Sequence, residues 1–171
     1  MISAKSKFRI VDMGFREIII LVPGWATDYR IFDTLDLDYN YLLPVEFNPV
    51  DFEVCLSEFL DTAPAGRVSL FGWSQGGFLA SDFASRYPEK IDELILAGIR
   101  KGYDQKALEE IKLKLMRNKK AFLYKFYLDC FSPADNQGRK WFKSRLLKEY
   151  MDNMSAEQLI EGLDYLFRAG I

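Results

Sequence analysis

A serine flanked by two glycines is the group in this sequence best suited to covalent chemistry. Ser74 is the centre of the run Gly-Trp-Ser-Gln-Gly at residues 72–76. Residues 67–71 favour a β-strand and the small residues after the run favour a helix, which predicts a tight strand-to-helix turn. A bulky Cβ two residues to either side would obstruct such a turn, so glycines are needed there. The pattern predicts an exposed serine nucleophile.

Hydrogen-bond donors for a developing oxyanion are expected beside this serine, but a general base is missing. The predicted helix would present the backbone N–H of Gln75 and the positive end of its dipole. The sequence contains no histidine. Serine is a poor nucleophile at neutral pH without a base, and losing a member of a Ser-His-Asp triad lowers the rate by about 10⁴-fold to 10⁶-fold. We therefore expect the chain by itself to be nearly inert.

The two cysteines do not indicate metal or redox chemistry. Cys55 and Cys130 lie on different predicted helices, without a Cys-x-x-Cys spacing and without a histidine to complete a metal site. We interpret both as thiols of the hydrophobic core and expect no cofactor and no metal.

Length and composition indicate one globular domain with a sizeable core. The 171 residues are 49% hydrophobic and 15% aromatic. No apolar run approaches the roughly 20 residues of a membrane span, and the N-terminus lacks the apolar core of a signal peptide. We expect a cytoplasmic protein without a membrane partner.

The net charge of −2 conceals a strong asymmetry along the chain. Residues 1–99 have a net charge of −7, residues 100–149 of +8 and residues 150–171 of −3. A basic block of this kind is typical either of a surface for an acidic partner or of an ordinary solvated helix face. Nucleic acid is not expected as the partner, because the block carries no recognisable binding motif and the whole chain is acidic.

The first hundred residues alternate between predicted strands and helices. Residues 17–22 form a continuous aliphatic run, which is typical of a strand buried on both faces of a parallel sheet. The alternation predicts an α/β fold with a mainly parallel sheet and helices on both of its faces. The predicted strands are residues 8–12, 17–22, 41–47, 67–71 and 91–97. A helix is predicted over residues 52–62, with an apolar face formed by Val54, Cys55, Phe59 and Leu60.

From Asp104 onward the pattern predicts helices only, about four of them. Asp104 is interpreted as the N-cap of the first, although it follows a strand closely enough to be a candidate acid. The third is predicted to run through Trp141 to Met151, and Ser155 opens the fourth with a capping-box spacing. We expect a core domain at residues 1–103 and a helical cap or lid at residues 104–171, over the carboxyl edge of the sheet.

Three stretches together resemble the α/β-hydrolase family, and the resemblance covers essentially the whole chain. They are the strand and loop at residues 21–25, with Pro23 in the usual place of a histidine, the serine run at residues 72–77, and the link into the next strand at residues 87–96. Within the family they look most like the carboxylesterases of biotin synthesis that cleave a pimeloyl carrier-protein methyl ester. The resemblance implies a serine hydrolase, a carboxylesterase or thioesterase, acting on a small-molecule or carrier-protein-linked acyl ester.

The resemblance also implies roles for individual residues. Ser74 would be the nucleophile, and the backbone N–H groups of Gln75 and Trp25 would form the oxyanion hole. The side chains of Trp73 and Trp25 would flank the acyl pocket, or simply pack in the core. Basic residues of the cap would hold an acidic acyl carrier protein; they are Arg139, Lys140, Lys143 and Lys148.

The sequence departs from the family where the later triad members are expected. Family order is serine, aspartate, then histidine, and the strands that would deliver the last two are absent, so we expect a fold incomplete at its C-terminus. One explanation is a fragment of a longer esterase, which we favour because the sheet would otherwise leave a long apolar edge. The alternatives are a non-catalytic protein that binds an acyl group or a carrier protein, and a half-enzyme completed by a second chain.

Overall fold

The computed structural model describes residues 7–45, 48–62 and 67–170. Five strands form one sheet in the order β1-β3-β2-β4-β5. Their bounds are Phe8–Val11 for β1, Ile18–Val22 for β2, Asn40–Pro44 for β3, Val68–Trp73 for β4 and Glu93–Ala97 for β5. Strands β2 to β5 are parallel, and β1 pairs with β3 in the antiparallel sense. The predicted mainly parallel sheet is therefore confirmed.

Strand β3 shows how the sheet accommodates a proline. The prediction placed this strand at residues 41–47, of which residues 46 and 47 lie outside the described part of the chain. Pro44 is the last residue of β3 and lies beyond the residue pairs between β3 and β2, so only β1 pairs with it. A proline is tolerated at such a position because no ladder hydrogen bond to a central strand is lost.

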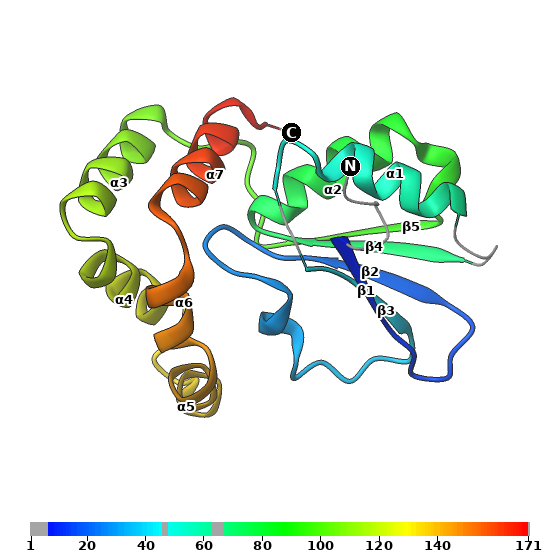
Figure 1. The fold of residues 1–171 in the computed structure, drawn as a ribbon, viewed down its shortest axis with the longest axis horizontal. Coiled ribbons are helices and arrows are strands. Elements are labelled where there is room, and N and C mark those ends of the chain that lie inside the picture. The colour runs from blue at the N-terminus through cyan, green and yellow to red at the C-terminus, as the bar shows by residue number, and fades with distance from the viewer. Residues whose placement is uncertain (1–6, 46–47, 63–66, 171) are drawn as a thin grey trace.

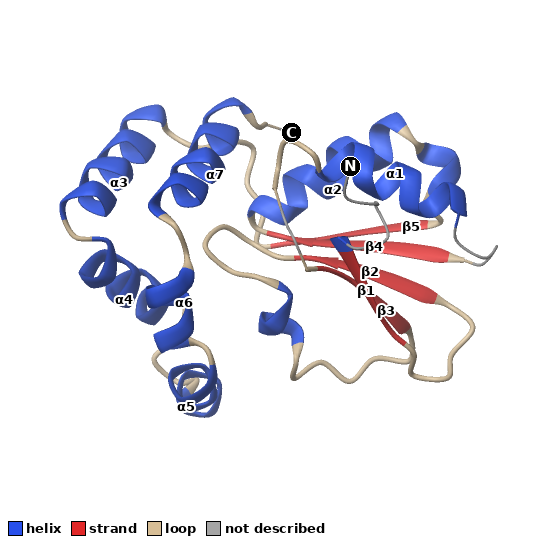
Figure 2. Cartoon of the chain, viewed as in Figure 1, coloured by secondary structure: helices blue, strands red, loops and turns tan. Residues whose placement is uncertain are grey.

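The two faces of the sheet are covered differently (Figures 1 and 2). The α-helices α1, Phe52–Thr62, and α2, Gln75–Arg86, lie on one face and share an apolar cluster with the strands. The second face packs against the long segment between β2 and β3, which contains the short 3₁₀ helix η2, Tyr29–Phe32. Helices were predicted on both faces. The structure has α-helices on one face, and on the other the short 3₁₀ helix η2 stands where an α-helix was expected.

Helix α1 forms where it was predicted, and most of its predicted apolar face packs toward the sheet. Its buried residues are Phe52, Leu56 and Phe59. Val54, which was expected to face the core, is 57% exposed. Phe59 is buried and both Cys55 and Leu60 pack partly buried against the same apolar cluster, so Val54 is the one misplaced residue of the four.

The second half of the chain is a block of helices beside the carboxyl ends of the parallel strands (Figure 1). We call α3 to α7 the helical block. Their bounds are Gln105–Arg117, Lys119–Asp129, Asn136–Arg145, Leu147–Asn153 and Ala156–Arg168. The block has its own apolar core, which also includes Trp25 and Ala26 from the loop after β2 and Phe78 from α2.

The predicted third helix is in fact two helices, so the described block has five helices where about four were expected. Leu146 has φ −119° and separates α5 from α6. The change of direction buries both Leu146 and Leu147 in the core of the block. No helical residue pattern marks this break, because the helix is interrupted to serve packing between elements.

The predicted helix starts are confirmed. Ser155 and Gln158 form a capping box at α7, with Gln158 N donating to Ser155 Oγ at 3.1 Å. Asp104 caps α3 by accepting a hydrogen bond from Ala107 N at 2.8 Å. Within the described ranges, no helix has the length and apolar character needed to cross a membrane.

Candidate active site

Ser74 is a one-residue junction between strand and helix. Strand β4 ends at Trp73 and helix α2 begins at Gln75. Ser74 has φ 54° and ψ −117°, which only glycine adopts readily. A backbone of this kind costs about 1–3 kcal/mol and persists where the surrounding structure enforces it.

The two glycines of the serine run allow backbones to approach closely. A Cβ on Gly72 would lie 2.6 Å from Gly77 Cα, and one on Gly76 would lie 2.5 Å from Pro23 O. Both obstacles are backbone atoms, which cannot move aside cheaply. The turn is therefore packed against the end of β2, and the serine is held beside the loop that follows that strand.

The loop after β2 brings a second backbone donor to Ser74. A Cβ on Gly24 would lie 3.2 Å from Ser74 Cβ, so this loop passes directly beside the serine. Among the described residues, the N–H of Trp25 and that of Gln75 donate no hydrogen bond, and Ser74 Oγ makes none. Two such donors next to a strained serine, whose Oγ has no partner in the described part of the chain, are suited to stabilising a tetrahedral oxyanion.

The side chains of the same two donor residues point elsewhere. Trp25 Nε1 donates to Leu159 O at 2.8 Å, and Gln75 Nε2 donates to Gly162 O at 2.7 Å. Both acceptors belong to α7. The Trp25 ring is 7% exposed and packs on Phe126 with ring centroids 5.0 Å apart. Its side chain therefore packs between elements, while its backbone N–H donates to none of the described residues.

Tyrosines of the helical block hold the rest of this loop. Ala26 has φ 60°, and Tyr127 Oη donates to its carbonyl oxygen at 2.5 Å. Tyr150 Oη donates to Asp28 Oδ1 at 2.9 Å. Burial raises the pKa of Tyr127 and of Tyr150, so both hydroxyl groups keep their protons and remain donors.

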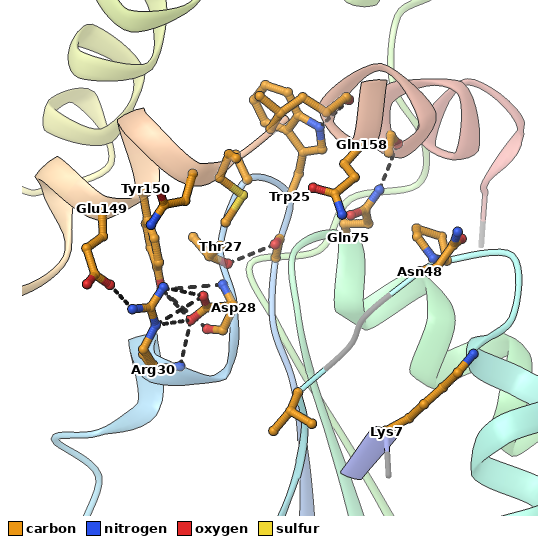
Figure 3. A pocket seen from close by; sticks show the side chains of 18 residues that line it. Lys7, Trp25, Thr27, Asp28, Arg30, Asn48, Gln75, Glu149, Tyr150 and Gln158 are labelled. Atoms are coloured by element: carbon orange, nitrogen blue, oxygen red, sulfur yellow. Dashed lines mark hydrogen bonds and ion pairs between the residues drawn. The ribbon is translucent and has the colours of Figure 1, made fainter. Parts of the chain in front are cut away.

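A cluster of ion pairs joins the end of the loop after β2 to helix α6. Arg30 pairs with Asp28 from its own turn, at 2.8 Å between Nη2 and Oδ2, and with Glu149 from α6. Its hydrogen bond to Asp28 raises the pKa of Arg30. Figure 3 shows these three charged groups together on one side of a cavity.

That cavity has a volume of about 560 Å³ and lies between the loop after β2, the loop after β3 and helices α6 and α7 (Figure 3). Its size is in the range of small-molecule sites. Gly24, Trp25 and Gln75 line it, whereas Ser74 and Trp73 do not. The cavity thus touches the two donor residues without including the serine itself.

Trp73, which was predicted to flank an acyl pocket, does not line this cavity. Its ring atoms are 3.2 Å from the Cβ positions of Gly24 and Gly98. Trp73 is partly exposed next to Ser74. A contact between Trp73 and an acyl group remains a proposal for the surface beside the serine.

The predicted partner-binding cations differ in accessibility. Lys140, Lys143 and Lys148 are exposed and form no ion pair within the described ranges. Arg139 is partly buried, donates to Ser132 O at 3.4 Å, and its Nε has no hydrogen-bond partner in the described part of the chain. Arg139 is therefore not a free surface cation like the three lysines.

The cysteines are free, as predicted, but one of them is not in the core. Cys55 is partly buried in α1, whereas Cys130 is exposed at the end of α4. Protein atoms around the sulfur and nearby Asp129 raise the pKa of the Cys130 thiol. The described residues contain no cluster of His, Cys, Asp or Glu able to hold a metal ion.

The sequence did not reveal the long-range hydrogen bonds that hold Trp25, Gln75 and the loop after β2 in place. The hydrogen bonds of Trp25, Gln75, Tyr127 and Tyr150 join residues that are 134, 87, 101 and 122 positions apart. One signal was present, because Gly162 interrupts an otherwise good helix and an interior glycine costs about 1 kcal/mol relative to alanine.

Comparisons with known proteins agree on the fold. An esterase from Exiguobacterium antarcticum and a bromoperoxidase from Bacillus anthracis each superpose with a TM-score of 0.75 at 15% identity, over 95% of this chain and 70% of theirs. At that identity the likeness establishes the fold alone.

Curated relatives match over shorter segments. A putative 2-succinyl-6-hydroxy-2,4-cyclohexadiene-1-carboxylate synthase from Bacillus subtilis is 36% identical over 78 residues, or 44% of this chain and 28% of that protein. The biotin biosynthesis bifunctional protein BioHC of Teredinibacter turnerae is 31% identical over 96 residues, or 47% of this chain and 17% of that protein. The matched segments span less than a third of either relative.

A family model described as the alpha/beta hydrolase fold matches residues 38–150, which is more than half of the chain. This match includes the serine run and most of the helical block. Together with the five-stranded sheet and the strand-to-helix serine junction, it shows that the chain belongs to the alpha/beta hydrolase fold family.

Proposed function

We propose that this chain carries the nucleophile and the oxyanion hole of a serine esterase or thioesterase. One observation carries the proposal: the free N–H groups of Trp25 and Gln75 lie at a serine held in strained backbone. Strain at a reactive residue is typical of functional sites, and unpaired donors beside it are suited to a charge that develops during reaction.

The reaction would proceed through an acyl-enzyme. Ser74 Oγ attacks the ester carbonyl carbon, and the carbonyl oxygen becomes an oxyanion that accepts hydrogen bonds from the two N–H groups. The C–O or C–S bond to the leaving group then breaks, and water later cleaves the Ser74 ester. The serine proton must go to a base. The sequence has no histidine, so we propose that the base comes from outside these 171 residues and that the chain alone is nearly inert.

Chemical rescue tests this proposal on the chain as it exists. Imidazole in solution would accept the serine proton, and a p-nitrophenyl butyrate probe would report acylation by release of p-nitrophenol and by a mass increase on Ser74. We expect an imidazole-dependent rate for the natural chain above that of Ser74→Ala, which measures the reaction of imidazole alone. Equal rates for the two proteins would contradict the proposal.

A non-catalytic binding protein is the second candidate, and the cavity is the observation that favours it. The 560 Å³ space contacts Trp25 and Gln75 but not Ser74, so a ligand could occupy it without meeting the nucleophile. Saturable binding of hexanoate, used as an acyl probe and followed by tryptophan fluorescence, would support this function if Ser74→Ala bound equally well and no Ser74 acylation occurred.

We further propose that the substrate is an acyl group on an acidic carrier protein, with a place in biotin synthesis. The BioHC name supports the pathway, and the exposed cations Lys140, Lys143 and Lys148, which form no ion pair with the described residues, support the carrier. Reversal of charge in a Lys140→Glu and Lys143→Glu double variant should weaken binding of acyl carrier protein at low salt.

The matched control for that experiment is a double variant of two exposed lysines elsewhere in the basic block, Lys101→Glu and Lys106→Glu. It makes the same change in net charge outside the proposed surface. Equal loss of affinity in both double variants would show a general charge effect and would refute a specific docking surface.

A further inference from the structure

The centre of helix α7 is in direct contact with both residues of the candidate oxyanion hole. Trp25 and Gln75 reach α7 through buried side chains that are 7% and 3% exposed. They donate hydrogen bonds to Leu159 O and Gly162 O, which are three residues apart and therefore on one face of the helix. The residues whose backbones offer the free donors are thus anchored by the helical block.

Gly162 is the residue that permits this contact. A Cβ at position 162 would lie 2.6 Å from Trp25 Cδ1, 3.0 Å from Trp25 Nε1 and 3.1 Å from Gln75 Nε2. The distance to Trp25 Cδ1 is well below the closest approach that real Cβ atoms make, whereas the other two distances lie at that limit or just above it. A methyl group would therefore displace the Trp25 ring.

The Trp25 ring has little freedom to move aside. Phe122 and Phe126 of α4 pack on it with ring centroids at 6.3 Å and 5.0 Å, and its Nε1 is bound to Leu159 O. The next residue, Ala26, is in left-handed backbone and is held by Tyr127. A shift of the ring would consequently be passed to the loop backbone that carries the free Trp25 N–H.

The helix itself gives no reason for a glycine. Residue 162 lies in the middle of α7, whose start is stabilised by a full capping box. Alanine is favoured over glycine in a helix interior, so local helix stability alone would select another residue. The contact with Trp25 and Gln75 supplies the missing reason.

We propose that Gly162 is a positioning residue for acyl transfer at Ser74. By letting the indole and amide side chains seat against α7, it sets the direction of the Trp25 and Gln75 backbone N–H groups toward the developing oxyanion. The helical block then takes part in the reaction without contacting the acyl group. This inference rests on the proposed function of Ser74.

The test compares Gly162→Ala with Glu161→Ala, an exposed neighbour on the same helix, in the imidazole-assisted acylation of Ser74. Loss of an oxyanion donor lowers rates by about 10²-fold to 10³-fold, so partial misplacement in Gly162→Ala should lower the maximal rate by about tenfold or more. The ester concentration at half-saturation should stay unchanged, because bound ester contacts the donors strongly only in the transition state. Glu161→Ala should match the natural chain.

The indole N–H resonance of Trp25 gives a readout that does not depend on catalysis. It should move in Gly162→Ala and stay in place in Glu161→Ala. If the resonance moves but the maximal acylation rate of Gly162→Ala is unchanged, the inference is wrong and the proposed function is unaffected. The same holds if the resonance does not move. A natural chain no faster than Ser74→Ala would overturn both.

A second variant covers the case in which Gly162→Ala does not fold. Trp25→Phe removes the hydrogen bond to Leu159 O without adding volume and keeps the backbone N–H of residue 25. It should lower the maximal acylation rate in the same way. A folded Trp25→Phe protein with the natural rate would overturn the inference.

Discussion

At the scale of single residues, Ser74 combines a local conformational cost with a position that chemistry would require. Its φ of 54° places a Cβ-bearing residue where glycine is favoured, and Gly72, Gly76 and the loop after β2 enclose it. The fold therefore maintains strain at one position, which is expected where a reactive group must project from a tight turn.

This strain leads to a prediction about stability. Ser74→Gly should be more stable to urea than Ser74→Ala by about 1 kcal/mol, because relief of roughly 1–3 kcal/mol of strain exceeds the extra unfolded-state entropy of glycine. Ser81, in the middle of α2, is the control. There the order should reverse, with glycine less stable than alanine by about 1 kcal/mol. The same order at both positions would rule out strain at Ser74.

At the scale of elements, α7 connects the helical block to both candidate donor residues. It is held at its start by the capping box of Ser155 and Gln158 and at its centre by Trp25 and Gln75. Its buried residues belong to the core of the helical block. Loss of the capping box at the start of this helix should therefore lower the stability of the whole helical block.

Ser155→Ala tests the capping box. Loss of a serine N-cap should lower the free energy of unfolding by about 1 kcal/mol, because the N–H of Gln158 loses its acceptor. Ser81→Ala, in the interior of α2, provides the comparison and should be neutral or slightly stabilising. Equal effects in chemical denaturation would indicate that tertiary contacts, and not the cap, hold the start of α7.

At the scale of the whole molecule, the helical block and the sheet are joined by buried tyrosines. Tyr127 and Tyr150 are 2% and 1% exposed and hydrogen bond to Ala26 and Asp28 of the loop after β2. Their pKa values are raised by burial first, and by the charge of Asp28 second. The contact between the helical block and the loop after β2 therefore depends on two tyrosine hydroxyl groups that remain neutral.

A dependence of stability on alkaline pH follows. Above pH of about 10 the unfolded chain loses these phenol protons while the folded chain keeps them, so the free energy of unfolding must fall as pH rises. Each tyrosine can contribute at most about 1.4 kcal/mol per pH unit. Replacing both Tyr127 and Tyr150 by phenylalanine should flatten this decline between pH 10 and 11.5 in urea titrations. Tyr124→Phe, at a residue 46% exposed, should leave it unchanged. An unchanged slope in the double variant would contradict the assignment.

Several features of the fold could be predicted because they depend on neighbours in the sequence. The strand at residues 18–22, the serine junction at residue 74 and the caps at Asp104 and Ser155 follow from local backbone preferences and short spacings. Features that needed knowledge of packing were wrong or incomplete. They include the exposed Val54, the exposed Cys130 and the break at Leu146.

The sequence by itself located the serine junction at residue 74, where we propose that an acyl group attaches, and it contains no histidine. Only the tertiary structure revealed that the N–H groups of Trp25 and Gln75 donate no hydrogen bond to any described residue, while their side chains hold α7 at Leu159 and Gly162. The physical reason is the distance along the sequence, because a turn is encoded by the backbone preferences of adjacent residues. The anchoring instead joins Trp25 to Leu159, 134 positions away, and Gln75 to Gly162, 87 positions away. These contacts exist only once the helical block has packed against the sheet.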